Sequence, residues 1–298
     1  MERRAWTLLL VLASVWGASY LFIEIALEDI SPALIVFLRT ALAGLVLLPL
    51  AMRRGALAGL RRLAGPLLLL AAMQVAGPFL LISVGQEEIT SSLAGILVAS
   101  APIFTALLAV WIDHDERSTG SRLVGVLTGI VGVGLLLGVD VGGDSAALVG
   151  GLMVVVASVG YALGGFYLKR RFATVQPLGV VTMTMLASAV LTLPLAAITV
   201  PDAHFHAGSL AAMAALGVVG TGVAFVIFYS LIAEVGPARA SIVAYIAPLF
   251  AVGYGVTLLD ESVSWGTLAG LVLIVAGSWL AAGGALRGER RVLVREPV

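Results

Sequence analysis

The sequence contains no cysteine and no asparagine, and Lys169 is the single lysine among its 17 basic residues. Without cysteine there are no disulfides, no thiolate metal sites and no thiol redox chemistry. Without asparagine there is no N-glycosylation sequon. Charged residues are also scarce at 11% of the chain, where soluble domains have about a quarter. Apolar residues make up 60% instead, which is typical of an integral membrane protein.

Ten apolar runs are long enough to cross a hydrocarbon core, which takes about 20 residues of helix. The runs are 5–26, 32–52, 63–84, 91–112, 121–139, 146–168, 177–200, 208–233, 237–259 and 264–285. The first run follows Arg3 and Arg4 as in a secretory signal, but it exceeds the usual apolar core of about 7 to 15 residues. We therefore predict an all-α integral membrane protein with ten transmembrane helices.

The second half of the chain repeats the first. Pro32, Pro49, Pro102, Gly125 and Gly132 have counterparts 144 to 146 residues later in Pro177, Pro194, Pro248, Gly270 and Gly277. Each copy holds five apolar runs, an odd number, so the second copy must enter the bilayer from the opposite side. We predict two inverted five-helix repeats, residues 1–142 and 143–286, followed by a basic cytoplasmic tail at 287–298. Inverted repeats of this kind are typical of transporters.

The basic residues favour one orientation. If the first helix runs outward, every lysine and arginine except Arg39 lies on the inner side. By the positive-inside rule both termini are then cytoplasmic. The preference for arginine over lysine, with abundant Ala, Gly and Val, is typical of proteins encoded by GC-rich bacterial genomes. We therefore expect a multi-pass protein of the bacterial cytoplasmic membrane.

Pro102 and Pro248 lie in the middle of the fourth run of each copy. Each proline lacks the amide that would bond a carbonyl one turn back, and in a bilayer such carbonyls must be satisfied by protein or by cavity water. We read the pair as hinges beside a polar cavity between the two halves. The alternative is a packing kink without ligand contact.

Glu24 and Arg39 are the two ionisable residues clearly inside the membrane. A charge at the centre of a membrane helix costs about 2.5 to 3.5 kcal/mol on insertion scales, so such residues normally face protein or water. One interpretation is a buried salt bridge between the first two helices. The other is a site for a proton or a substrate charge. The aligned residues of the second copy are Leu168 and Thr184, and this one-sidedness argues against the salt bridge, although an anchor of topology would show it too.

Several aromatic and polar residues are spaced to share helix faces toward such a cavity. Pockets for small molecules are mostly apolar with a few placed polar groups. The candidate substrate-binding residues are Trp16, Tyr20, Gln74, Ser100, Tyr161, Thr221, Phe225 and Tyr245. The alternative for each tyrosine is an interface anchor or a packed core residue.

Other marks have mainly structural interpretations. The glycines near Gly125 and Gly270 let neighbouring helices approach closely. The acid runs at Asp113–Glu116 and Asp260–Glu261 are more often solvated or capping the next helix than bound to metal. His204 and His206 are equally weak metal candidates. We expect no metal, no cofactor and no catalytic residue set.

The motifs resemble a known family when taken together. They are Trp16-Gly17-Ala18-Ser19, Phe37-Leu38-Arg39, the Ala-Pro-hydrophobic-Phe runs around Pro102 and Pro248, the acid pairs after them and the glycine spacing. Their order is similar to the EamA-type branch of the drug/metabolite transporter superfamily. The resemblance covers the whole chain and implies an exporter or facilitator with a central cavity lined by helices 1, 3, 4, 6, 8 and 9, working by alternating access.

The sequence favours a secondary-active transporter of small metabolites such as amino acids or drug-like compounds, because it has no phosphate-binding loop to couple ATP. A proton is the candidate coupling ion, through Glu24. The bilayer and a small-molecule substrate are the expected partners, with no nucleic acid. The main alternative is a membrane-embedded enzyme acting at the interface, for which the His114 region and the Asp140–Asp144 loop lack a catalytic spacing. A passive channel, ordinarily built from rings of equivalent subunits, is a weaker alternative.

Overall fold

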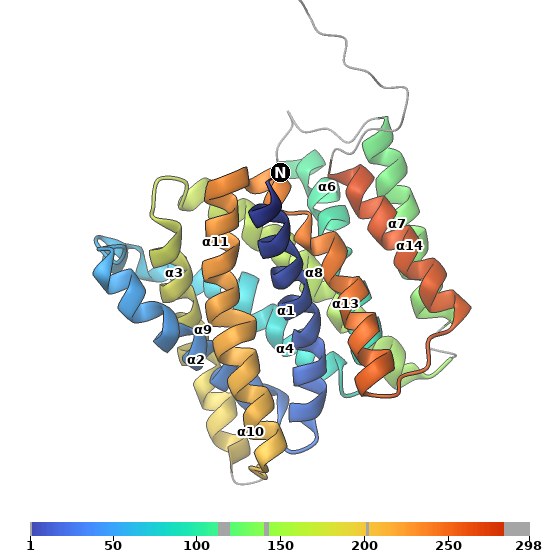
Figure 1. Cartoon of the computed structure of the whole chain (residues 1–298), viewed down its shortest axis with the longest axis horizontal. Helices are drawn as coiled ribbons and strands as arrows, with labels where there is room; N and C mark the ends of the chain where they lie inside the picture. The colour runs from blue at the N-terminus through green and yellow to red at the C-terminus, as the bar shows by residue number, and fades with distance from the viewer. Residues whose placement is uncertain (1, 113–119, 140–142, 201–202, 283–298) are drawn as a thin grey trace, which may run out of the picture.

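The computed structural model describes residues 2–112, 120–139, 143–200 and 203–282, and these residues form helices joined by short turns (Figure 1). The first half contains α1 (Arg3–Leu27), α2 (Pro32–Arg53), the 3-10 helix η1 (Leu60–Leu63), α3 (Ala64–Ala71), the π-helical η2 (Ala72–Ala76), α4 (Gly77–Gly85), α5 (Ser91–Val98), α6 (Ala101–Ile112) and α7 (Ser121–Val139). The second half contains α8 (Ser145–Arg171), α9 (Pro177–Thr199), α10 (Ala207–Ala214), the π-helical η5 (Ala215–Val223), α11 (Ala224–Val235), α12 (Pro237–Ala240), α13 (Val243–Leu258) and α14 (Trp265–Ala281). The all-α prediction is confirmed for these residues. The His114 region, most of the Asp140–Asp144 loop and the tail 287–298 lie outside them.

Eight helical segments of the described chain are apolar and at least 18 residues long, as a membrane crossing requires. They correspond to the first eight predicted runs. Two further apolar helices, Val243–Leu258 and Trp265–Ala281, are shorter. The former is short because its run begins with the separate helix α12 and a turn at Ser241 and Ile242. The chain is thus an all-helical, multi-pass membrane protein, while the count of ten crossings stays a prediction.

Short local signals set where the helices begin. Ser31 precedes α2 and its Oγ accepts a hydrogen bond from the Leu34 amide at 3.3 Å. Thr90 precedes α5 and accepts in the same way from Leu93 at 3.2 Å. Side-chain oxygens at this position satisfy amides that have no partner inside the helix. These caps fix the turns that precede α2 and α5.

Pro102 and Pro248 differ in their structural effect. Pro102 lies at the second position of α6, and α5 ends at Val98, so a turn at Ala99 and Ser100 interrupts the segment. Pro248 instead lies inside the continuous helix α13. The structure therefore shows a break at one of the two matched prolines, and a hinge at either of them stays a prediction.

Hydroxyl groups satisfy the carbonyls at the Pro102 break. The Leu97 carbonyl accepts from the hydroxyl of Ser100 at 2.6 Å and from that of Ser158, on α8, at 3.3 Å. The Ala99 carbonyl accepts from the hydroxyl of Ser278, on α14, at 2.6 Å. A lipid environment offers no other donors to such groups, so the interruption is held in place by helices of the second half.

Matched segments of the two halves pack in matched ways. The equivalents α7 and α14 pack side by side, and so do α2 and α9 (Figure 1). The remaining contacts are exchanged: α1 packs on α13, while its counterpart α8 packs on α5 and α6. Exchanged contacts of this kind are what a pseudo-twofold arrangement of the halves predicts. The inverted orientation of the halves in a membrane stays a prediction.

Glycines permit the close approach of α7 and α14. A Cβ at Gly277 would lie 2.5 Å from the Gly129 amide nitrogen and 2.7 Å from the Gly125 carbonyl oxygen. Any larger residue would push the two backbones apart. The packing interpretation of these glycines is confirmed.

Candidate functional site

A cavity of about 730 Å³ lies inside the bundle. Its lining comes from both halves and includes residues of all six helices expected from the sequence. Further lining comes from α2 with Arg39, from α9 with Val180, Thr184 and Met185, from α7 with Arg122 and from α14 with Ala281. Sequence reasoning missed α9 because its lining residues are ordinary apolar and small polar residues without a distinctive pattern.

The two ends of the bundle differ in charge, and we name them accordingly. The basic end carries Arg4 near the start of α1, Arg53 at the end of α2, and Lys169, Arg170 and Arg171 at the end of α8. The acidic end carries Glu28 and Asp29 after α1, Glu87 and Glu88 after α4, and Asp260 and Glu261 after α13. In Figure 1 the N-terminus marks the basic end at the top and α10 lies at the acidic end below.

The cavity reaches the surface at the basic end. There its lining includes Arg122 at the start of α7 and the exposed residues Ser241 and Ala282. Toward the acidic end the lining stops at Ile23 and Ile82, which are buried. Both belong to a large buried apolar cluster that also contains Ala26, Ile30 and Leu34 around the α1–α2 turn and Leu93 and Leu97 of α5. The cavity is therefore open toward one end of the bundle and closed toward the other.

Arg39 lies in the closed part of this cavity. Its side chain is 8% exposed, and its Nε donates to Thr221 Oγ1 at 2.8 Å. The central carbon of the guanidinium lies 3.8 Å from the centroid of the Phe79 ring, a cation–π contact. Thr221 itself does not line the cavity. Its hydroxyl donates to the Leu216 carbonyl five residues earlier, which is the spacing of a π-helical turn.

Glu24 lies elsewhere. Its carboxylate accepts from Gln86 Nε2 at 3.2 Å, and the same amide nitrogen donates to the Tyr20 carbonyl at 3.1 Å. Glu24 does not line the cavity, and among the described residues it forms no ion pair with Arg39. The predicted salt bridge between the first two helices is therefore wrong, because each side chain has turned to a different neighbour.

Most of the other candidate residues meet at the cavity. Trp16 packs against two phenylalanines of α11, with ring centroids 6.2 Å from Phe225 and 5.2 Å from Phe228. The candidates that line the cavity are Trp16, Tyr20, Gln74, Tyr161, Phe225, Tyr245, Pro102 and Pro248. Ser100 is buried behind the wall, where its hydroxyl satisfies the Leu97 carbonyl. Substrate contact by any of these residues stays a prediction.

The acidic end is closed by hydrogen bonds between the halves as well as by apolar packing. After α13, Glu261 turns back to the first half, and its carboxylate accepts from the amides of Ser91 at 2.8 Å and Ser92 at 3.1 Å, and from the Ser92 hydroxyl. These amides belong to the first turn of α5, where a carboxylate is stabilised by the helix dipole. The sequence indicated a capping role for the acid pair, but toward the next helix rather than across the repeat.

A second contact joins the halves at the same end. Asp29 accepts from the Ser209 hydroxyl and lies 2.9 Å from His206 Nδ1. Hydrogen bonds from Ser209 and His206 hold the pKa of the Asp29 carboxyl below its ordinary value. His206, a weak metal candidate by sequence, has the Asp29 carboxylate as its partner in the structure. Both contacts bring together residues 169 or more positions apart, so no local pattern could reveal them.

Comparisons with known proteins follow the whole length of the chain. The model of the EamA-like transporter family matches residues 4–138 and again residues 148–283. An uncharacterized inner membrane transporter of Escherichia coli, YedA, is 28% identical over 286 residues, covering 91% of this chain and 90% of its own. A probable amino-acid metabolite efflux pump of the same organism is 23% identical, covering 99% of both chains. One crystal structure superposes with a TM-score of 0.67 at 21% identity over 94% of this chain and 97% of its own.

Proposed function

Because the chain belongs to the EamA-like transporter family within the drug/metabolite transporter superfamily, we propose that it is a secondary-active carrier that exports a small metabolite by alternating access. The family and the names of its relatives support a transporter of small metabolites. They favour a carrier over the membrane-embedded enzyme.

One observation carries the proposal of alternating access: the central cavity opens toward one end and is closed at the other. Its volume of about 730 Å³ lies within the range of about 300 to 1,000 Å³ typical of small-molecule sites. A channel needs a continuous path, whereas a carrier exposes its site to one side at a time. The matched packing of the halves supports a second state in which the acidic end opens and the basic end closes.

The charge asymmetry gives the proposed state a direction. Under the positive-inside rule the basic end is cytoplasmic, so both termini are cytoplasmic and the cavity is loaded from the cytoplasm. Export then consists of closing the basic end and breaking the contacts of Glu261 and Asp29 at the acidic end.

We also propose that Glu24 carries the coupling proton. It lies against Gln86, whose Oε1 is buried and has no hydrogen-bond partner among the described residues. When Glu24 is ionised, the Gln86 amide nitrogen donates to it. When Glu24 is protonated, its hydroxyl can donate to Gln86 Oε1 after the amide rotates. Glu24 therefore has Gln86 as a hydrogen-bond partner in both its ionised and its protonated state.

Counterflow tests the carrier. Purified protein is reconstituted in vesicles preloaded with an amino acid or a related metabolite, and uptake of trace labelled compound is followed. A carrier shows uptake driven by exchange, while a channel dissipates the label without trans-stimulation. Absence of exchange for every compound that stabilises the purified protein against heat would contradict the proposal.

The proton is tested on the same vesicles. Glu24→Gln is expected to abolish the response of transport to a pH gradient while counterflow continues. Glu28→Gln is the matched control, because Glu28 is exposed one turn further along the chain. Full pH-driven transport by Glu24→Gln would remove Glu24 from the coupling mechanism.

A further inference from the structure

Arg39 is a cation in the cavity without an anion. Among the described residues no carboxylate pairs with it, and Glu24, the nearest candidate by sequence, is bonded to Gln86. A charged side chain inside a membrane protein normally pairs with an opposite charge, with carbonyls or with water. Here the Arg39 residue is only 8% exposed and still lines the cavity.

The contacts of Arg39 hold the guanidinium but leave donors unused. A guanidinium has five N–H donors, and the described contacts use one, from Nε to Thr221. The Phe79 ring covers one face at 3.8 Å. A donor held on one edge and one face is restricted in orientation, so the remaining N–H groups are presented as a preformed fork. Such a fork matches the two oxygens of a carboxylate.

Two hydroxyls lie close to this fork. Tyr20 on α1 and Tyr161 on α8 both line the cavity and are near enough to Arg39 to interact with its charge. Neither hydroxyl has a hydrogen-bond partner among the residues that the structure describes. One cation and two unpaired hydroxyl donors from three helices form a site with the chemistry to bind a single anionic group.

The rest of the described lining restricts the remainder of the ligand. It contains no aspartate or glutamate, and its second cation, Arg122, lies at the open mouth. The wall beyond Tyr20 is aromatic, formed by Trp16, Phe225 and Phe228. A dianion would lack a second cation near Arg39, and an ammonium group would lack an anionic partner.

We propose that the substrate is an apolar organic acid with one carboxylate and no cationic group, and that Arg39 anchors its carboxylate with the help of Tyr20 and Tyr161. This rests on the proposed function, since it specifies what the central cavity carries. It separates the chain from carriers of zwitterionic amino acids, whose ammonium group this lining does not match.

Four probes of one skeleton test the proposal: 3-phenylpropionate, 3-phenylpropionamide, 3-phenylpropylamine and phenylalanine. The first three differ in the charge of one end, and phenylalanine adds an α-ammonium group to the acid. With the wild-type protein, 3-phenylpropionate is expected to raise the melting temperature and to support counterflow. The other three are expected to bind at least about 10-fold more weakly. Equal binding of the amide, or preferred binding of phenylalanine, would overturn the proposal while leaving the carrier function standing.

Variants locate the anchor. Arg39→Gln is expected to weaken 3-phenylpropionate binding about 10- to 100-fold and to leave binding of the amide unchanged, since a charge-assisted pair is lost. Arg39→Lys keeps the charge without the fork and is expected to fall between. Arg53→Gln, at the exposed end of the same helix α2 and outside the cavity lining, is the matched control with near wild-type affinity.

The outcomes separate the two proposals. If Arg39→Gln binds 3-phenylpropionate as tightly as the wild type, Arg39 is not the anchor. Should Arg39→Gln fail to fold, the acid and amide comparison on the wild-type protein decides by itself. The wild-type protein could exchange none of the four probes but exchange another neutral or cationic compound. That result would refute the proposed acid substrate and leave the proposed carrier function standing. One that exchanges nothing contradicts both.

Discussion

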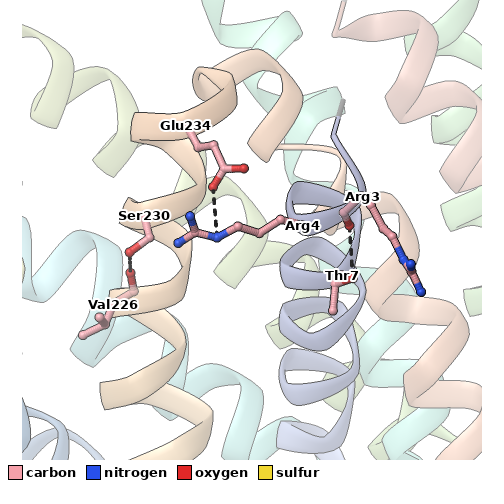
Figure 2. A network of polar contacts seen from close by, with 6 residues as sticks. All are labelled: Arg3, Arg4, Thr7, Val226, Ser230 and Glu234. Carbon is pink, nitrogen blue, oxygen red and sulfur yellow. Dashed lines mark hydrogen bonds and ion pairs between the residues drawn. The ribbon is translucent and has the colours of Figure 1, made fainter.

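The acidic end of the bundle closes the cavity whereas the basic end leaves it open, and the contacts between helices differ at the two ends. At the acidic end Glu261 and Asp29 of opposite halves each accept several hydrogen bonds from the other half. At the basic end the Arg4 Nε atom lies 3.8 Å from Glu234, with 77% of the Arg4 side chain exposed (Figure 2). An exposed pair at this distance contributes little, about 0 to 1 kcal/mol. The difference indicates that the contacts at the acidic end maintain the one-sided cavity.

These contacts are suited to an end that must open again. Hydrogen bonds between halves are directional and are lost together once the helices separate by a few ångströms. Neighbouring packing reinforces them, since α4 and α8 approach through Gly85 and Gly150 at the same end. Weakening any of these contacts should therefore raise the population open at the acidic end, and the size of the effect should follow the strength of the contact.

The largest effect is expected for Glu261→Ala. It removes a carboxylate that accepts three hydrogen bonds and leaves the α5 amides without a partner, at a cost of about 2 to 4 kcal/mol. The readout uses the absence of native cysteine: Ile82→Cys places one thiol at the closed limit of the cavity. A membrane-impermeant maleimide added to intact cells should label it at least about 10-fold faster in the Glu261→Ala background.

Asp260→Asn is the control for this prediction. Asp260 adjoins Glu261 and has a φ of 54°, a conformation that asparagine tolerates. In the Asp260→Asn background, Ile82→Cys should be labelled as fast as in the background without a change at Asp260 or Glu261. Equal labelling rates for Glu261→Ala and the wild type would show that the carboxylate does not hold the acidic end closed.

Gly150→Ala is expected to have a smaller effect. The new Cβ would lie 2.8 Å from the Gly85 carbonyl oxygen. Separating the backbones costs about 1 to 3 kcal/mol, offset by roughly 1 kcal/mol of gained helix propensity. Gly165→Ala, on the same helix with open space at its Cβ, should be neutral or stabilising. An equal fall in melting temperature in both variants would mean that the close approach of α4 and α8 does not account for the cost of Gly150→Ala.

Sequence patterns predicted the helices more successfully than their interruptions. The first eight apolar runs match the observed segments closely because length, capping residues and loop charges are local properties. The π-helical η5 positions Thr221 to accept a hydrogen bond from Arg39. No proline in its sequence predicts this irregular turn, and its only distinctive feature is a glycine-rich stretch. Pro248 produced no break, since the interruption lies at Ser241 and Ile242. A proline removes one bond, and the surrounding packing decides whether the helix breaks there.

The candidate site was predictable in part for the same reason. Helical spacing placed Trp16 and Tyr20 on one face, and both line the cavity. Arg39 was found because charge in a membrane segment is rare. The salt bridge to Glu24, one of the two interpretations left open by the sequence, is not formed. The choice of Thr221 and Gln86 as partners depends on contacts between segments distant in sequence, which composition and periodicity do not encode.

The next effect in size is a pH dependence at Asp29. A carboxyl with a depressed folded-state pKa stabilises the fold above its ordinary pKa of about 3.9, and the contribution is lost as pH falls through the lower folded-state value. The melting temperature of the wild type should therefore exceed that of Asp29→Asn above pH 4. The difference should vanish as the pH falls further. A constant difference across that range would show that the contact with Ser209 and His206 does not depend on ionised Asp29.

Ser31→Ala is expected to have the smallest effect and gives the finest test of the comparison between the ends. Ser31 accepts from the Leu34 amide as a helix cap and donates to Thr199 of the other half at 2.7 Å. Asp144→Ala removes a cap of the same kind at the start of α8, where the side chain bonds Ala146 within its own half. Each variant should lose about 1 kcal/mol of stability. If bonds between the halves keep the acidic end closed, only Ser31→Ala should also speed labelling of Ile82→Cys; equal labelling in both would attribute the closure to helix stability alone.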